Sequence, residues 1–228
     1  MFCAATFSFL DDLAANNNRA WFEANRLRYE AEVREPALEF IAAMAPLLDR
    51  VAPHFRAEPR KVGGSLMRVF RDTRFSRDKT PYKTNIGIQF RHDLGKDVHA
   101  PGFYLHVSAS ECFLGAGCWH PDADALGRIR RLVAEDPERW FKARDDRKFG
   151  GHWTLSGDAL TRPPRGYAPD HPALEDLKRK DFIAIAPLSC DDVISPGLPR
   201  LAGRRFASAA PLMSFLCKAL GVPFDTGR

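Results

Sequence analysis

Short segments rich in β-branched and aromatic residues follow one another in the middle of the chain, joined by loops rather than by helix-length crossovers. The strand candidates are residues 65–72, 86–91, 103–109 and 112–119. Antiparallel strands can be joined by a tight hairpin, whereas parallel neighbours need a crossover of roughly a dozen or more residues. The link between the last two candidates, Ala109-Ser110-Glu111, is short enough for a hairpin. This pattern predicts a central, largely antiparallel sheet.

Helical periodicity precedes this region. Between residues 6 and 55, apolar side chains recur at spacings of three to four or seven residues, which is typical of helices with one buried face. The asparagines at positions 16–18 separate the first two helices, because asparagine can both end and cap a helix. Pro36 fits the first turn of a third helix, and Pro53 ends it. Three short helices are therefore expected before the sheet.

More helices and strands are expected in the second half of the chain. Helices are predicted between Pro121 and Pro137, around Trp140, and over residues 172–180 and 211–220. Strands are predicted over residues 154–160 and 182–186. The whole pattern predicts an α+β fold, in which a central, mostly antiparallel sheet is flanked by N-terminal and C-terminal helices.

The length of the chain is sufficient for one well-buried core, since 45% of its 228 residues are hydrophobic. No linker-like segment divides it, so we expect a single domain over residues 1–228. No apolar run approaches the roughly 18 residues that span a bilayer, and the first residues lack a secretion signal. The five cysteines are odd in number and form no C-x-x-C pair, which favours a reducing compartment. We expect a cytoplasmic protein with no membrane partner.

The positive charge of the chain is concentrated in residues 68–83, which read RVFRDTRFSRDKTPYK. This window holds six cationic side chains and two aspartates, a net charge of +4, while the whole chain carries +5. Convergent arginine and lysine side chains have an anion as their complement, because the guanidinium fork fits phosphate or carboxylate and lysine adds a compact charge. We therefore predict an anion-binding site. Its predicted residues are Arg68, Arg71, Asp72, Arg74, Phe75, Asp78, Lys79, Tyr82 and Lys83.

The acids and aromatics in this window allow more than one role. Asp72 and Asp78 would orient the cations by ion pairing, act as a general base or bind Mg²⁺. Phe75 and Tyr82 would either stack on a ligand ring or anchor the loop in the core. We favour an anchoring role for Phe75 and leave both roles open for Tyr82. The plainest alternative is a solvated loop with weak ion pairs.

The same residues resemble a known signature. The pattern R-x-x-R-D-x-R-F-x-x-[D/N]-K-x-x-Y of the bacterial domain of unknown function 2461 (DUF2461) is met at every fixed position between Arg68 and Tyr82. The resemblance extends over nearly the whole chain, through Phe9-Leu10, Asn16-Asn17, Trp21-Phe22, residues 115–119, Ile129-Arg130 and residues 164–167. It implies one domain of this length and strengthens the choice of site. It implies no activity, because none is established for the family.

Cys112, Cys118 and His120, with His106 nearby, are residue types that bind metals. Their C-x5-C-x-H spacing matches no standard zinc arrangement, and cysteine is among the most frequently buried residues. We therefore interpret them as structural. The sequence indicates no metal site, and it leaves any cofactor and the oligomeric state unspecified.

Other candidates are weaker. His152 and His171 could each serve as a base, but neither lies in a recognisable catalytic context, so both are expected to be structural or exposed. Gly63-Gly64-Ser65 lacks the P-loop pattern and is expected to form a plain turn. The basic runs at residues 128–131 and 178–180 are expected to be solvated surface.

The sequence leaves four functions open. The leading interpretation is a protein that binds an anionic ligand bearing phosphate or carboxylate. The second is an enzyme acting on such a molecule, with Asp72 or Asp78 as acid or base and Tyr82 as a proton donor or orienting group. The third is a structural ion-pair network that includes Arg71. Nucleic-acid binding is less favoured, because a nucleic-acid patch needs only positive charge, whereas this window also contains acids and a tyrosine.

Overall fold

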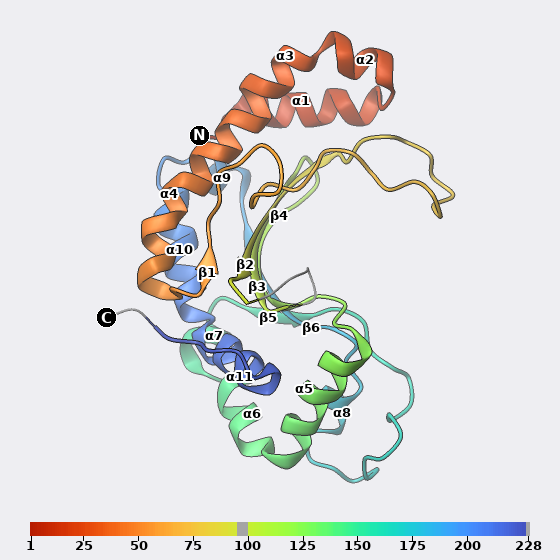
Figure 1. Ribbon diagram of the computed structural model, residues 1–228, viewed down its shortest axis with the longest axis vertical. Helices are drawn as coiled ribbons and strands as arrows, with labels where there is room; N and C mark the ends of the chain where they lie inside the picture. Colours follow the sequence, from red (N-terminus) through yellow and green to blue (C-terminus); the bar gives the residue numbers. More distant parts are fainter. Residues whose placement is uncertain (95–99, 227–228) are drawn as a thin grey trace.

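A curved sheet of six strands forms the centre of the fold, in the order β1-β2-β3-β4-β6-β5 (Figure 1). The computed structural model describes residues 1–94 and 100–226. The strands are β1 Phe55–Arg56, β2 Asn85–His92, β3 Gly102–Ser108, β4 Cys112–Cys118, β5 Thr154–Ser156 and β6 Phe182–Leu188. All neighbouring strands are antiparallel. The predicted α+β fold with an antiparallel sheet is confirmed.

Helices precede the sheet, fill the connections between β4 and β6 in the chain, and follow β6. The N-terminal ones are α1 Ala4–Ala15, α2 Arg19–Ala24, α3 Arg26–Tyr29, the π-helical turn η1 Glu30–Arg34 and α4 Glu35–Val51. The later ones are α5 Ala123–Glu135, α6 Pro137–Arg144, α7 Arg147–Gly150, α8 Leu174–Leu177, α9 Cys190–Ile194, α10 Leu198–Ser208 and α11 Ala210–Leu220. None of the helices in the described ranges is long and apolar enough to cross a membrane.

The two faces of the sheet have different surroundings, because successive side chains of a strand point to opposite sides. On one face, Phe90 and Phe103 are fully buried beneath α4 and α10. The ring centroid of Phe103 lies 4.6 Å from that of Phe206 in α10, and Phe90 lies 6.3 Å from Phe40 in α4. The opposite face is concave and opens away from these helices (Figure 1).

The link between β3 and β4 forms the predicted hairpin. Val107 pairs with Cys112 at its base. Ser108 N donates to Glu111 O at 3.0 Å, and the Ser108 hydroxyl donates to the same carbonyl oxygen at 2.9 Å. Two hydrogen bonds to the same carbonyl oxygen therefore close this turn. They fix the register of β3 and β4, the two strands at the centre of the sheet.

Pro36 lies in the first turn of α4, as predicted, but no loop separates α4 from the helical turns before it. α3, η1 and α4 form one continuous helical run, and Pro36 lies inside it. A proline has no N–H to donate to the carbonyl four residues earlier, which here is that of Glu32. The hydroxyl of Thr6, which is fully buried in α1, donates to Glu32 O at 2.7 Å. The run tolerates the proline because α1 supplies this missing donor.

The prediction of a strand over residues 65–72 is wrong. Its first part does pair with β2, through hydrogen bonds from Gln89 N to Ser65 O (2.8 Å) and from Met67 N to Gly87 O (2.9 Å). Leu66 lies opposite Ile88, however, and β2 begins at Asn85. A strand that continued past Leu66 would therefore run out of β2 residues to pair with after only a few positions. The chain then has no partner strand in the sheet and leaves it.

Other boundaries also differ from the predictions. The strand predicted over 154–160 ends at Ser156, because Gly157 adopts a φ of 98° and lies so close to Asp181 that a side chain would clash. The helix predicted over 172–180 is reduced to α8. α9 and α10 were not predicted. A single domain over residues 1–228 stays a prediction.

Candidate functional site

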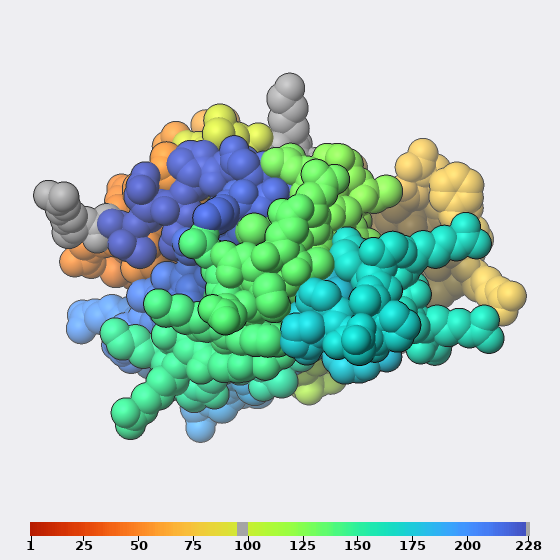
Figure 2. Space-filling view, turned by 90° about the horizontal axis from the view of Figure 1, so that it is seen from below, coloured from red at the N-terminus to blue at the C-terminus, as the bar shows by residue number. Residues whose placement is uncertain are grey.

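The site residues predicted from the sequence lie on a projecting arm, residues 68–83, which precedes β2 (Figure 1). The arm pairs with itself, since Arg71 N donates to Pro81 O at 2.9 Å and Lys83 N donates to Val69 O at 2.7 Å. Seen from below, it projects at the side of the molecule in yellow-orange (Figure 2). The predicted residues are therefore spread along a hairpin-like element rather than gathered at one point.

Arg74 and Lys79 are occupied by partners within the arm. Arg74 makes a two-pronged contact with Asp72, in which Nη2 lies 2.7 Å from Oδ2 and Nε lies 3.0 Å from Oδ1. Lys79 Nζ donates to Thr73 O at 2.8 Å. The guanidinium of Arg74 lowers the pKa of Asp72 to about 2. Asp72 is thus a poor proton acceptor at neutral pH.

Arg71 belongs to a second group within the arm. Its Nη1 contacts the carboxylate of Asp78 and the hydroxyl of Thr80. The other oxygen of Asp78 accepts a hydrogen bond from Thr80 N at 2.9 Å. The Thr80 amide and the Arg71 guanidinium together lower the pKa of Asp78 to about 2. Each acid of the arm therefore orients a different arginine, which is the ion-pairing role among those predicted for Asp72 and Asp78.

Acidification is expected to release this second group. The pKa of Asp78 is lowered on folding, so its stabilising contribution is present above the ordinary value of 3.8 and is lost as pH falls towards 2. The NMR chemical shift of the Thr80 amide should therefore titrate with a midpoint near pH 2. The Asp78→Asn variant should lack this titration. A midpoint at 3.8 or above would show that Asp78 is not held by Thr80 and Arg71 in solution.

Phe75 does not anchor the arm, so the role favoured from the sequence is wrong. Its side chain is 96% exposed, with the Arg74 guanidinium 5.8 Å from the ring centroid. The arm extends so far from the sheet that no core lies within reach of its outer end (Figure 1). Phe75 is therefore a solvent-facing ring beside a cation.

Tyr82 is the anchor of the arm. Only 2% of it is exposed, and its ring stacks on Phe22 of α2 with a centroid separation of 4.1 Å. The side chain of Asn17 bonds to both backbone groups of Tyr82, donating to its carbonyl at 2.9 Å and accepting from its N–H at 3.0 Å. These contacts hold the base of the arm against the N-terminal helices.

Lys83, the last residue of the arm, lies at a pocket on the concave face of the sheet, which we call the sheet pocket. Its volume is about 440 Å³. One part of the lining is polar and comprises Lys83, Asn85, Gln89, Tyr104 and His106. The other part is apolar and includes Met67, Phe113, Trp119, Ile183 and Ile185. The strands β2, β3, β4 and β6 thus form its floor, and the base of the arm forms one side.

Glycines make room for this pocket. Tyr104 lies opposite Gly115 in the register of β3 and β4, and a Cβ at Gly115 would lie 3.3 Å from the Cβ of Tyr104. A Cβ at Gly87 on β2 would lie 2.7 Å from the Tyr104 hydroxyl. The Tyr104 ring can therefore lie across the floor of the pocket because Gly115, opposite it on β4, and Gly87, beside its hydroxyl on β2, have no side chain.

Tyr104 and His106 form a polar pair inside the pocket. Tyr104 Oη lies 3.3 Å from His106 Nδ1, and His106 Nε2 lies 3.9 Å from a carboxylate oxygen of Glu111. The His106 ring stacks on Phe113 at a centroid distance of 4.7 Å. Burial raises the pKa of Tyr104 to about 12 and lowers the pKa of His106. At neutral pH both side chains are therefore uncharged hydrogen-bonding groups.

Lys83 supplies the positive charge at the pocket. Burial lowers the pKa of its ammonium group, and the nearby charge of Arg68 lowers it further. No carboxylate in the described part of the chain forms an ion pair with Lys83 or Arg68. Two cations that repel each other thus lie at the base of the arm. Asp72 acts on Arg68 through charge alone, since its own hydrogen bonds go to Arg74. Their arrangement favours an anion between or beside them.

The comparison with known families supports the resemblance found in the sequence. The sequence model of DUF2461, described as a conserved hypothetical protein, matches residues 5–215. The chain belongs to the DUF2461 family. The match includes the arm and every residue that lines the sheet pocket, and the family description assigns no activity. No curated protein and no solved structure matches the chain.

Of the other residues considered as candidates from the sequence, His106 lies in the sheet pocket and the rest lie elsewhere. Cys112 and Cys118 are buried on the helix-covered face, and His120 Nδ1 lies 3.0 Å from Asp181. The ring nitrogens of His171 contact backbone groups, and His152 is exposed. Residues 63–65 form the expected turn, in which Ser65 bonds to the backbone of residues 56 and 58.

Most residues that line the sheet pocket were not predicted from the sequence. Asn85, Gln89, Tyr104 and Trp119 were not proposed as site residues. A signal for them exists, because alternate positions of β2 and β3 on one face are glycine or polar while the positions between them are large and apolar. A face of this composition in the middle of a sheet indicates an open, solvated surface.

Proposed function

We propose that the protein binds a small molecule in the sheet pocket, and that this ligand combines an anionic group, phosphate or carboxylate, with an apolar or aromatic body. The observation that carries the proposal is the position of Lys83. Its ammonium group lies at the pocket, and no acid in the described ranges forms an ion pair with it. Arg68 adds a second cation close to it.

The remaining lining fits such a ligand. A volume of about 440 Å³ falls within the usual range for small-molecule sites. The amides of Asn85 and Gln89 and the hydroxyl of Tyr104 offer hydrogen bonds at the cationic end. Phe113 and the half-exposed Trp119 offer ring surfaces for the apolar body. The exposed face of Trp119 would be covered by the ligand.

The outer part of the arm has a different role in this proposal. Arg71, Arg74 and Lys79 are engaged by acids or carbonyls of the arm itself. The predicted anion site is therefore divided: the outer residues shape the arm, and Arg68 and Lys83 at its base bind the anion. This division also weakens the nucleic-acid interpretation, because cations paired in this way release few counterions on binding a polyanion.

The experiment that tests the proposal uses 1-naphthyl phosphate as the probe, titrated by isothermal calorimetry. Lys83→Met should weaken its binding by roughly 10- to 100-fold, because a hydrogen bond to a charged group contributes about 1.5–3 kcal/mol. Lys79→Met is the matched control and should bind as the wild type does, since Lys79 contacts Thr73 O on the arm. Equal losses in both variants, or none in Lys83→Met, would contradict the assignment of Lys83.

Proton transfer in the same pocket is a second candidate function. The contact between Tyr104 and His106 favours it, because a neutral imidazole beside a tyrosine hydroxyl can accept or relay a proton. An enzyme of this kind should still bind its ligand after Tyr104→Phe but lose turnover. It would not use Asp72 or Asp78, whose pKa values lie at about 2 and which lie outside the pocket.

The proposed location is the cytoplasm. All five cysteines of the chain carry free thiols in the structure, and three of them are buried. Burial raises the pKa of Cys118 and Cys217, so these thiols are unreactive. Free thiols, among them these two unreactive ones, suit a reducing compartment.

A further inference from the structure

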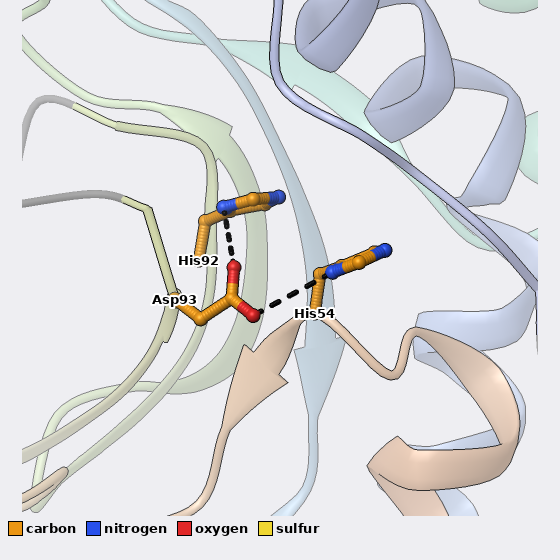
Figure 3. Close-up of side chains that lie close together, drawn as sticks. All are labelled: His54, His92 and Asp93. Carbon is orange, nitrogen blue, oxygen red and sulfur yellow. Dashed lines mark ion pairs between the residues drawn. The ribbon is translucent and has the colours of Figure 1, made fainter.

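A second cluster of polar side chains lies on the other side of the sheet from the pocket. His54 precedes β1, and His92 and Asp93 are at the end of β2 (Figure 3). His92 Nδ1 lies 3.2 Å from Asp93 Oδ1, and His54 Nδ1 lies 3.5 Å from Asp93 Oδ2. The three ligand atoms lie within 4.8 Å of one another. The two imidazole rings stack at 5.5 Å with the carboxylate beside them.

The hydrogen bonds of His92 assign its proton to Nε2. This nitrogen lies 2.8 Å from Pro223 O, a carbonyl oxygen that can only accept. The other nitrogen, Nδ1, accepts from Leu94 N at 3.1 Å and therefore carries a lone pair. His92 is 1% exposed, so its ring is fixed in this orientation by the C-terminal segment. Its lone pair faces the Asp93 carboxylate.

His54 has the same arrangement. Its Nε2 lies 3.1 Å from a carboxylate oxygen of Asp225, which assigns a proton to that nitrogen and, in the neutral ring, leaves a lone pair on Nδ1. This lone pair also faces Asp93 (Figure 3). Metal-binding histidines usually donate their second N–H to a carbonyl or carboxylate in this way, which fixes the tautomer and the ring orientation.

Two imidazole lone pairs and a carboxylate that converge repel one another unless a proton or a metal cation lies among them. Arg56 Nη2, which donates to Asp93 Oδ2 at 3.2 Å, supplies part of the positive charge from the exposed side. Leu94 N supplies one N–H to His92. A metal at His92 Nδ1 would displace this N–H, which would then bond to water.

We propose that His54, His92 and Asp93 bind a divalent transition metal of the Zn²⁺ and Fe²⁺ class. Two imidazoles and one carboxylate are a donor set that these ions favour. Donor atoms around a tetrahedral zinc ion lie roughly 3.4 Å apart, given bond lengths of about 2.1 Å. The imidazole nitrogens lie 3.2 Å from Oδ1 and 3.5 Å from Oδ2 of Asp93, and the three donor atoms lie within 4.8 Å of one another, so the cluster would draw in around an ion.

The metal links parts of the chain that are far apart in sequence. Its ligands come from the segment before β1 and from the end of β2, and the groups that orient them, Pro223 O and Asp225, come from the C-terminal segment. The site is independent of the sheet pocket, because His92 follows Phe90 on the helix-covered face. Binding is therefore expected to raise the melting temperature and to leave ligand binding in the pocket unchanged.

Titration of the metal-free full chain with Co²⁺ at pH 7.5, followed by visible absorption, tests this site. Binding of about one equivalent is expected, and competition with Zn²⁺ gives the zinc affinity. His54→Ala and Asp93→Asn should each weaken binding by about 100-fold or more. Asp225→Asn should weaken it by about 10- to 100-fold, because it removes only the partner of a ligand.

His152→Ala is the matched control and should bind as the wild type does, since His152 is exposed and outside the cluster. The melting temperature of each variant without metal shows whether it has folded. A wild-type chain that binds no Co²⁺ at about 1 mM would overturn the proposal. Binding that is unchanged in folded His54→Ala and Asp93→Asn, or an intense thiolate absorption band, would place the metal elsewhere and also overturn it.

Discussion

Replacing Gly117 with alanine is expected to destabilise the protein by about 3 kcal/mol or more. Gly117 has a φ of 124°, a conformation that side-chain-bearing residues rarely adopt. A Cβ at this position would lie 2.1 Å from the carbonyl oxygen of Phe182 in β6. β4 is paired with β3 on one side and β6 on the other, so it cannot move away from this contact.

Chemical denaturation of Gly117→Ala beside Gly127→Ala measures this effect. Gly127 lies in α5, and a Cβ there would meet nothing within 4 Å. Alanine favours a helix over glycine, so Gly127→Ala should be neutral or stabilise by up to about 1 kcal/mol. A Gly117→Ala protein within about 1 kcal/mol of the wild type would mean that β4 and β6 approach less closely than described.

Tyr82→Ala is expected to lower the free energy of unfolding by about 3 kcal/mol, as truncation of a large buried aromatic side chain does. The ring packs between Phe22 at 4.1 Å and Phe70 at 5.5 Å, measured between centroids. Its removal leaves a cavity between α2 and the arm. Because Tyr82 precedes Lys83, the variant should also weaken binding in the sheet pocket.

Phe75→Ala provides the contrast within the same arm. Phe75 is 96% exposed, so its truncation should change the unfolding free energy by no more than about 0.5 kcal/mol. Urea denaturation of the two variants measures the difference directly. If Phe75→Ala were as destabilising as Tyr82→Ala, the outer end of the arm would have to pack against the protein in solution.

The sheet could be predicted because its information is local. Alternation along β2 and β3, and the short link at Ala109-Ser110-Glu111, indicate antiparallel strands without any knowledge of distant contacts. α10 was missed for the opposite reason. Gly203 in the middle of this helix weakens its helical pattern, and the helix packs against α4, where a Cβ at Gly203 would make an ordinary contact with Leu47 at 3.5 Å. That contact joins residues far apart in sequence.

The site was predictable only in part. The sequence identified the arm through its charges, and both the signature and the family match include it. Which cations pair internally depends on how the arm folds back: Arg71 reaches Asp78, whereas Lys83 is turned into the sheet pocket. Tyr82 and Phe75 were likewise separated only by a long-range contact, since Asn17 and Phe22 hold Tyr82.

The most direct test of the proposed function is a crystal structure of the protein with 1-naphthyl phosphate. The phosphate is expected to lie within hydrogen-bonding distance of Lys83 Nζ, about 3 Å, with the naphthyl ring in the sheet pocket against Phe113 or Trp119. A phosphate bound instead to Arg71 or Arg74 on the outer arm, with an empty sheet pocket, would contradict the proposal.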